Sequence, residues 1–224
     1  MIRLAEFSRP LFFTGAGLSA ESGIPTYRGA GGLWHEYDYR SYACQDAFER
    51  DPEKVWDFHD LRRKKVAACE PNEGHRIIAA LPHAKVVTQN VDGLHQRAGS
   101  TDVVELHGSL WRLRGNGTVV ENLEVPLRSR RCDEGRYWRP DIVWFGDVLD
   151  PLVLQAAAHA LQWCDLLVSI GTSASVYPAA ELPRIALRRG VPSVEINPEE
   201  TPVSARYAHR LRGTASEMLR RLME

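Results

Sequence analysis

The chain has 224 residues, with 28 Lys or Arg against 29 Asp or Glu, so its formal net charge is −1. This balance gives no bulk electrostatic reason to bind nucleic acid or an anionic membrane surface, and we expect neither partner. The 44% hydrophobic and 25% charged residues are ordinary for a globular protein and exclude a disordered or fibrous chain. The length favours a single domain over residues 1–224.

No run of about 18 apolar residues is present, and residues 1–10 lack the apolar core of a signal peptide. The four cysteines, Cys44, Cys69, Cys132 and Cys164, form no Cys-x-x-Cys pair. We therefore expect reduced thiols in a cytoplasmic protein rather than a disulfide scaffold.

Strand and helix patterns alternate along most of the chain. In chain order the sequence predicts a strand at 10–13, helices at 51–69 and 72–81, strands at 84–88 and 103–106, a helix at 151–163, a strand at 166–170, a helix at 179–189, a strand at 191–196 and a helix at 214–223. The strands are continuously apolar, as in parallel sheets buried on both faces. The fold class is therefore α/β, with a Rossmann-like parallel sheet covered by helices on both faces.

Residues 110–140 break this rhythm, since they are polar and carry Asn116-Gly117, a hairpin signal, between apolar pieces. We expect a small inserted lobe from about 29–81 and 110–140, and a large part from about 8–28, 82–108 and 141–224. The expected core of the insert is Trp111, Leu113, Val119, Leu123 and Val125.

Two motifs follow predicted strands at the edge where α/β folds bind ligands. Gly15-Ala16-Gly17 lets the backbone turn sharply and approach a pyrophosphate, although a tight turn without a ligand explains it equally well. A glycine-rich loop at 26–34, with Arg28, follows and could close over a ligand. At 88–95, Gln89, Asn90 and Asp92 bring amides and a carboxylate to the same edge, where the simpler alternative is a helix cap.

Further strand ends carry polar or small residues. His107 follows the strand at 103–106 and could accept a proton near neutral pH, although seven other histidines weaken the signal. Residues 139–147 read as an ordinary strand and turn, or as an edge on which an extended peptide adds. Gly171-Thr172-Ser173, Asn197 and 213–215 complete the set.

Taken together and in this order, the segments GAGLSAESGIPTYR, TQNVDGLH, ELHG, RPDIVWFGD, GTS and IN resemble the sirtuins, which are NAD-dependent protein lysine deacylases. The resemblance covers almost the whole chain. It implies NAD bound between a Rossmann-like part and a small lobe, and acylated-lysine proteins or peptides as partners. We expect a monomer.

The resemblance also implies roles for individual residues. His107 and Asn90 would be catalytic: the acyl carbonyl oxygen attacks the ribose carbon, nicotinamide leaves, and His107 takes a proton from a ribose hydroxyl. Val143, Phe145 and Gly146 would bind the peptide. The cofactor-binding set would be Gly15, Ala16, Gly17, Ala20, Arg28, Trp34, Gln89, Asn90, Val91, Asp92, Gly171, Thr172, Ser173, Asn197 and Ala215.

Two departures from the family pattern affect the metal and the substrate. Most sirtuins hold a structural zinc with two Cys-x-x-Cys pairs, but residues 110–140 contain Cys132 alone, so we expect no zinc. The subgroup that removes succinyl and malonyl groups carries Tyr-x-x-Arg on a helix, and His59 and Arg62 take those places here. An arginine there can bind a carboxylate, so the sequence favours acidic acyl groups over acetyl. The alternative is that Arg62 is one of four consecutive basic residues, 62–65, that face solvent.

Two other functions stay open from sequence alone. The same cleft would serve a NAD glycohydrolase or ADP-ribosyltransferase. A non-catalytic module that binds NAD or ADP-ribose would need no base at the position of His107.

Overall fold

The structure is a computed structural model that describes residues 2–27, 32 and 37–224. Its larger sheet has six strands in the order β3-β2-β1-β7-β8-β9, and every neighbouring pair is parallel. The strands are β1 (Pro10–Thr14), β2 (Lys85–Thr88), β3 (Val103–Glu105), β7 (Leu166–Ile170), β8 (Ser193–Ile196) and β9 (His209–Leu211). The predicted Rossmann-like sheet is confirmed, and β9 is a strand that the sequence did not predict.

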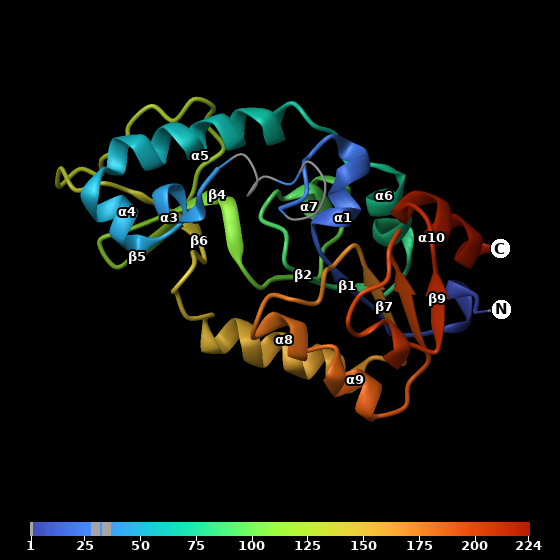
Figure 1. Ribbon diagram of the computed structural model, residues 1–224. Helices are drawn as coiled ribbons and strands as arrows, with labels where there is room; N and C mark the ends of the chain where they lie inside the picture. The colour runs from blue at the N-terminus through green and yellow to red at the C-terminus, as the bar shows by residue number, and fades with distance from the viewer. Residues whose placement is uncertain (1, 28–31, 33–36) are drawn as a thin grey trace.

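Helices cover both faces of this sheet (Figure 1). Alternate side chains of β1 point to opposite faces: Phe12 packs with α6 (Glu73–Ala80) and α10 (Ala215–Met223), whereas Leu11 and Phe13 pack with α8 (Pro151–Trp163) and α9 (Arg184–Arg188). Burial on both faces explains why these strands are apolar throughout.

The predicted helix starts carry side-chain caps. Asp51 accepts from the Lys54 N–H at the start of α5 (Pro52–Ala67), Asn72 accepts from the His75 N–H, and Thr214 accepts from the Glu217 N–H. The helix predicted at 179–189 is divided into η3 (Ala179–Glu181) and α9. The other short helices are η1 (Leu4–Glu6), α1 (Ala16–Ser19), η2 (Ala20–Ser22), α3 (Tyr39–Tyr42), α4 (Gln45–Arg50), α7 (Leu94–Arg97) and η4 (Ser204–Arg206).

The small lobe contains a three-stranded sheet, β5-β4-β6, at the left of Figure 1. It consists of β4 (Gly108–Gly115), β5 (Thr118–Glu121) and β6 (Arg139–Ile142), all antiparallel. Asn116 and Gly117 both have positive φ, 52° and 74°, as a two-residue hairpin turn requires. The predicted hairpin is therefore confirmed.

The expected core of this lobe is only partly correct. Leu113 is buried, but Val119, Leu123 and Val125 are 51%, 66% and 36% exposed. β5 lies at the edge of its sheet, and its four residues are all exposed. The lobe core instead forms beneath β4 and β6, from Val55, Val66, Leu110, Ile142, Trp144 and their neighbours.

Two arginines attach the inserted segment to α5. The buried Arg63 donates to the carbonyl oxygens of Leu110, Asn122 and Glu124, and to Oδ1 of Asn122. Arg130 binds the carboxylates of three α5 residues, Glu53, Asp57 and Asp60, at 2.6, 2.8 and 2.7 Å. These polar contacts fix 110–130 where apolar burial is sparse.

Candidate functional site

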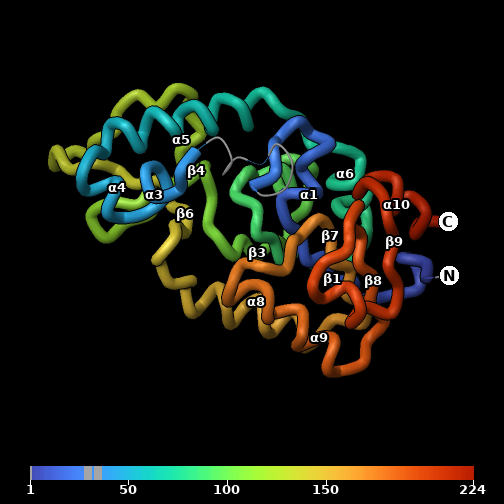
Figure 2. Tube along the Cα trace, in the orientation of Figure 1, coloured from blue at the N-terminus to red at the C-terminus, as the bar shows by residue number. Residues whose placement is uncertain are grey.

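A pocket of about 730 Å³ is lined both by residues that follow the large-sheet strands and by residues of the small lobe. Figure 2 shows these two parts of the chain, with the small lobe at the left and the large sheet at the right. The strand order reverses between β1 and β7, the place where open α/β sheets bind ligands. Seventeen predicted site residues line it: Gly15, Ala16, Gly17, Ala20, Arg62, Gln89, Asn90, Val91, His107, Val143, Phe145, Gly146, Gly171, Thr172, Ser173, Asn197 and Ala215.

The glycine turn after β1 packs directly on the turn after β7. A Cβ at Gly17 would lie 2.6 Å from the Cα of Gly171, and a Cβ at Gly15 would lie 2.8 Å from the Gly171 carbonyl oxygen. Gly171 itself has φ +60°. The glycines are thus needed for the close approach of two turns, and that approach forms the floor of the pocket.

Asn90 is fixed from two sides. Its Nδ2 donates to the Gly15 carbonyl and to Ser19 Oγ, both at 3.1 Å, and Ser19 in turn donates to Asp92 Oδ2 at 2.7 Å. Asp92 is 5% exposed and is not among the residues that line the pocket, so its expected contact with the cofactor stays a prediction. Burial raises the pKa of Asp92, and it acts here by holding Ser19 and the Leu94 N–H.

His107 lies at the end of β3 with one ring nitrogen engaged. Its Nδ1 lies 3.0 Å from the Gln89 carbonyl oxygen. A carbonyl oxygen only accepts, so Nδ1 carries the proton in this contact and Nε2 keeps its lone pair. Burial lowers the pKa of His107, opposed by this hydrogen bond, so the ring is neutral at pH 7. The arrangement leaves a proton acceptor at the pocket wall.

A hydrogen-bonded series links three strand ends across the pocket floor. Gln89 Nε2 donates to Thr172 Oγ1 at 2.9 Å, and Asn197 Nδ2 donates to the Thr172 carbonyl at 3.0 Å. The turns after β2, β7 and β8 are therefore held at fixed separations. This gives a rigid polar floor of amide and hydroxyl groups.

The segment after β6 forms the opposite wall. The Val143 N–H donates to the His107 carbonyl and the Phe145 N–H to the Ala43 carbonyl, both at 3.0 Å. Asp147 accepts from the Trp144 N–H and from Arg139. Among the described residues these N–H groups are already used, whereas the Gly146 N–H has no acceptor.

Arg62 and His59, three positions apart on α5, face different environments. Arg62 lines the pocket and donates to the hydroxyl of Tyr27, which lines it too. His59 is fully buried, stacks on Trp144 with ring centroids 5.8 Å apart, and does not line the pocket. Burial lowers its pKa well below the usual range. The expectation that His59 contacts the substrate is therefore corrected, and the phenol beside Arg62 is that of Tyr27.

Arg28 and Trp34, with most of the loop at 28–36, lie outside the described residues. Several lining residues were not predicted: Glu21, Tyr27, Trp144, Tyr177, Glu199 and Glu200. Glu21, Tyr27 and Trp144 fall within motifs that the sequence did single out. Tyr177, Glu199 and Glu200 follow strand ends by several residues, and no local pattern marks them.

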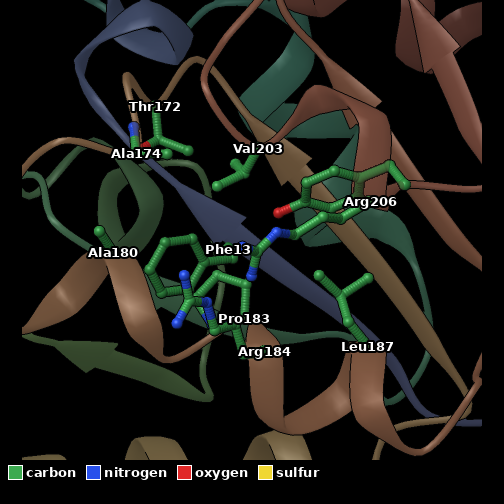
Figure 3. Close-up of a pocket in the computed structure, with 10 residues that line it drawn as sticks. Phe13, Thr172, Ala174, Ala180, Pro183, Arg184, Leu187, Val203 and Arg206 are labelled. Atoms are coloured by element: carbon green, nitrogen blue, oxygen red, sulfur yellow. The ribbon is translucent and has the colours of Figure 1, made fainter.

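A much smaller cavity lies under the turn at Thr172 and Ala174 (Figure 3). Its volume of about 10 Å³ has room for roughly one water molecule. Phe13, Pro183 and Leu187 close it, so it is a packing gap beneath the pocket floor and no ligand site.

Within the described part of the chain, no three His, Cys, Asp or Glu residues lie close enough to hold a metal ion. No described helix is long and apolar enough to cross a membrane.

Comparison with known proteins assigns the family. The Sir2 family model matches residues 15–178, which is most of the chain. The chain belongs to the Sir2 family. It is 46% identical over 231 residues to NAD-dependent protein deacylase 2 of Pyrobaculum aerophilum, covering 99% of this chain and 92% of that protein.

Two further relatives support the assignment to the Sir2 family. The mitochondrial NAD-dependent protein deacylase sirtuin-5 of Canis lupus familiaris is 38% identical over 250 residues, covering 96% of this chain and 81% of that protein. A mutant Sir2 homologue solved with ADP-ribose is 42% identical and superimposes with a TM-score of 0.94, covering 98% of this chain and 92% of the other. The predicted family and fold are confirmed.

Proposed function

We propose that this Sir2-family chain is an NAD-dependent protein lysine deacylase that moves the acyl group of a modified lysine to ADP-ribose and releases nicotinamide. The observation that carries the proposal is His107, which presents a neutral Nε2 at the wall of the pocket while Nδ1 is tied to Gln89. A pure binding module has no need for a base held in this way.

The residues of the pocket suit NAD. Its volume lies within the usual range for ligand sites, about 300–1,000 Å³. Thr172, Ser173 and Asn197 offer hydroxyl and amide groups to phosphate and ribose oxygens, and the carboxylates of Glu199 and Glu200 favour ribose hydroxyls over an added phosphate. When bound, NAD supplies an electrophilic ribose carbon and nicotinamide as the leaving group.

His107 would take a proton from a ribose hydroxyl through Nε2. The lowered pKa keeps the ring neutral at pH 7, so the acceptor is present without prior loss of a proton. The contact between Nδ1 and Gln89 orients the ring and stabilises it when it becomes charged. Asn90, fixed by Gly15 and Ser19, lies beside the same floor and would orient the nicotinamide end.

The segment of Val143, Phe145 and Gly146 would bind the peptide. Because the Gly146 N–H has no acceptor among the described residues, it is a donor for a carbonyl of an extended substrate. Apolar side chains of Val143 and Phe145 border the same wall and would contact the lysine stem.

Arg62 supports a preference for acidic acyl groups. It is a half-buried cation at the pocket wall that lies beside Tyr27 and forms no salt bridge with a carboxylate of the described residues. A guanidinium and a phenol hydroxyl together can bind one carboxylate of a succinyl or malonyl group. We further propose a zinc-free, monomeric enzyme of the cytoplasm.

The test of the general function uses His107→Ala. We expect turnover of an acyl-peptide with NAD to fall by about 10²–10⁴-fold while NAD binding is kept. His209→Ala, which removes an exposed ring, is the matched control. Unchanged turnover in His107→Ala would contradict the assigned role, and nicotinamide release without any peptide would favour a glycohydrolase.

The test of acyl preference compares succinyl- and acetyl-peptides in Arg62→Met. We expect a loss with the succinyl substrate of about tenfold or more, and little change with acetyl. Lys64→Met, which replaces an exposed cation two residues beyond Arg62, is the control. An equal loss with both substrates would reject the carboxylate clamp.

A further inference from the structure

A groove of about 790 Å³ runs along the outside of the large part, next to the pocket. On α8 it is lined by Pro151, Leu152, Leu154, Gln155 and Ala158, and on the opposite side by Glu181, Leu182, Arg184, Ile185 and Arg188. Both sets repeat the spacing i, i+1, i+3, i+4, i+7, which is one face of a helix. The groove is therefore a trough between two helical segments, which run side by side along the lower edge of Figure 1.

The groove continues from the mouth of the pocket. Pro178 lines both, while Leu149 lines the pocket two residues before Pro151 enters the groove. Exposed apolar side chains mark this junction: Val148 is 86%, Leu152 74% and Tyr177 68% exposed. Apolar groups this exposed beside a polar rim are typical of a surface that binds another chain.

The two ends of the groove differ in chemistry. Its near end and floor are apolar, with Leu152, Leu154 and Ile185. At the far end, Arg188 is exposed and makes no ion pair with the described residues, whereas Arg184 is paired with Glu181. The unneutralised charge at that end is positive, so it favours an acidic partner.

We propose that this groove binds the part of the substrate protein that flanks the acylated lysine, and that it selects an apolar residue followed by an acidic one. This inference rests on the proposed function, because it takes the pocket to hold the lysine. From Leu152 to Ala158 the helix rises about 9 Å. An extended chain covers that in about three residues, so the apolar residue and the acid lie within one short segment.

The opposite face of α9 shows why the groove stays open. Pro183 and Leu187 point inward and close the small cavity against Phe13 (Figure 3). Ile185 and Arg188 line the groove instead of the cavity, with Ile185 half-buried and Arg188 exposed. The groove is a surface with an apolar floor that the fold itself leaves uncovered.

The experiment measures KM and kcat with a short acyl-peptide and with peptides extended on either side by an apolar–acidic or an apolar–lysine segment. Wild type is expected to show a lower KM for one apolar–acidic extension than for the short peptide. Arg188→Glu should raise that KM about threefold or more, and Leu152→Glu about tenfold. The short-peptide KM and all kcat values should stay unchanged. Arg188→Glu should also gain affinity for the lysine-bearing extension.

Gln162→Glu and Arg210→Glu, both exposed and outside the groove, are the matched controls. Equal wild-type KM values for short and extended peptides, or an equal rise for both in Arg188→Glu, would overturn the proposal. Fluorescence anisotropy of a labelled extended peptide measures binding to the groove independently of turnover. If the short peptide is not deacylated at all, that result therefore counts against the proposed function and not against the groove. If the wild type sediments as a dimer and Leu152→Glu sediments as a monomer, the groove binds a second copy of the chain. That result would also overturn the proposal.

Discussion

Replacing Arg63 by methionine should loosen the small lobe without touching the pocket. Arg63 is 1% exposed and its guanidinium donates to three backbone carbonyls and one side-chain oxygen of 110–124. Most sirtuins resembled by this chain hold a structural zinc in this lobe, whereas here the inserted segment is held to α5 by this cation and by Arg130. Methionine keeps much of the buried volume but removes every donor.

A hydrogen bond from a charged donor contributes about 1.5–3 kcal/mol net. The contacts do not add, because the same Nη2 reaches both oxygens of Asn122 and the Glu124 carbonyl. Asn122 and Glu124 are also partly exposed, so water can replace part of the loss, whereas Leu110 is buried. We therefore expect Arg63→Met to lower the free energy of unfolding by about 3 kcal/mol. For a chain of this size that corresponds to about 6–12 °C in Tm.

Thermal and urea unfolding measure the total loss, and amide hydrogen exchange locates it. Protection should fall in β4 and β5 and persist in β1 and β7, because only the lobe loses its attachment. Arg63→Lys should lie between wild type and Arg63→Met, since it keeps the charge but not the forked donor. The exposed Lys64→Met should stay within about 0.5 kcal/mol. A Tm for Arg63→Met within one or two degrees of wild type would refute the reasoning.

Three further results are expected. Gly17→Ala should lower the free energy of unfolding, measured in urea, by about 1–3 kcal/mol and should weaken NAD binding, because its Cβ would lie 2.6 Å from the Cα of Gly171. Unchanged stability and NAD binding in this variant would contradict the argument that the two turns need glycine to approach each other. Burial lowers the pKa of His75 to about 4 and that of His95 to about 3. Below pH 6.5 the unfolded chain therefore binds more protons, and each ring should remove up to about 1.4 kcal/mol of stability per pH unit as the pH falls toward 4. A flat urea-midpoint profile between pH 7 and 5 would be inconsistent with those pKa values. Chelator treatment should leave Tm and activity unchanged, and elemental analysis that finds about one zinc per chain would contradict the zinc-free proposal.

Much of the fold was readable from local patterns. The continuous apolar runs at 10–13 and 166–170 predicted buried parallel strands, and the structure has β1 and β7 there as neighbours. Asn116-Gly117 predicted the hairpin because only residues that tolerate positive φ fit its turn. The polar residues at strand ends were predicted to share one edge, since parallel strands bring their carboxyl ends together, and His107, Gln89 and Thr172 do line one pocket.

What the chain order determined by itself was most of the strands of the large sheet, the helix caps, the hairpin turn and the residues that follow the strands, because each of these depends on neighbours within a few positions. The tertiary structure alone decided what became of His59, Arg62 and Arg63, which lie within five positions on one helix. α5 packs between the inserted segment, the segment after β6 and the pocket. His59 therefore lies in the core, Arg62 lines the pocket, and Arg63 donates hydrogen bonds to backbone carbonyls of the inserted segment. Asp92 was likewise decided by packing, since it is buried and accepts a hydrogen bond from Ser19. Helical spacing says which residues share a face, but only long-range contacts say what that face meets.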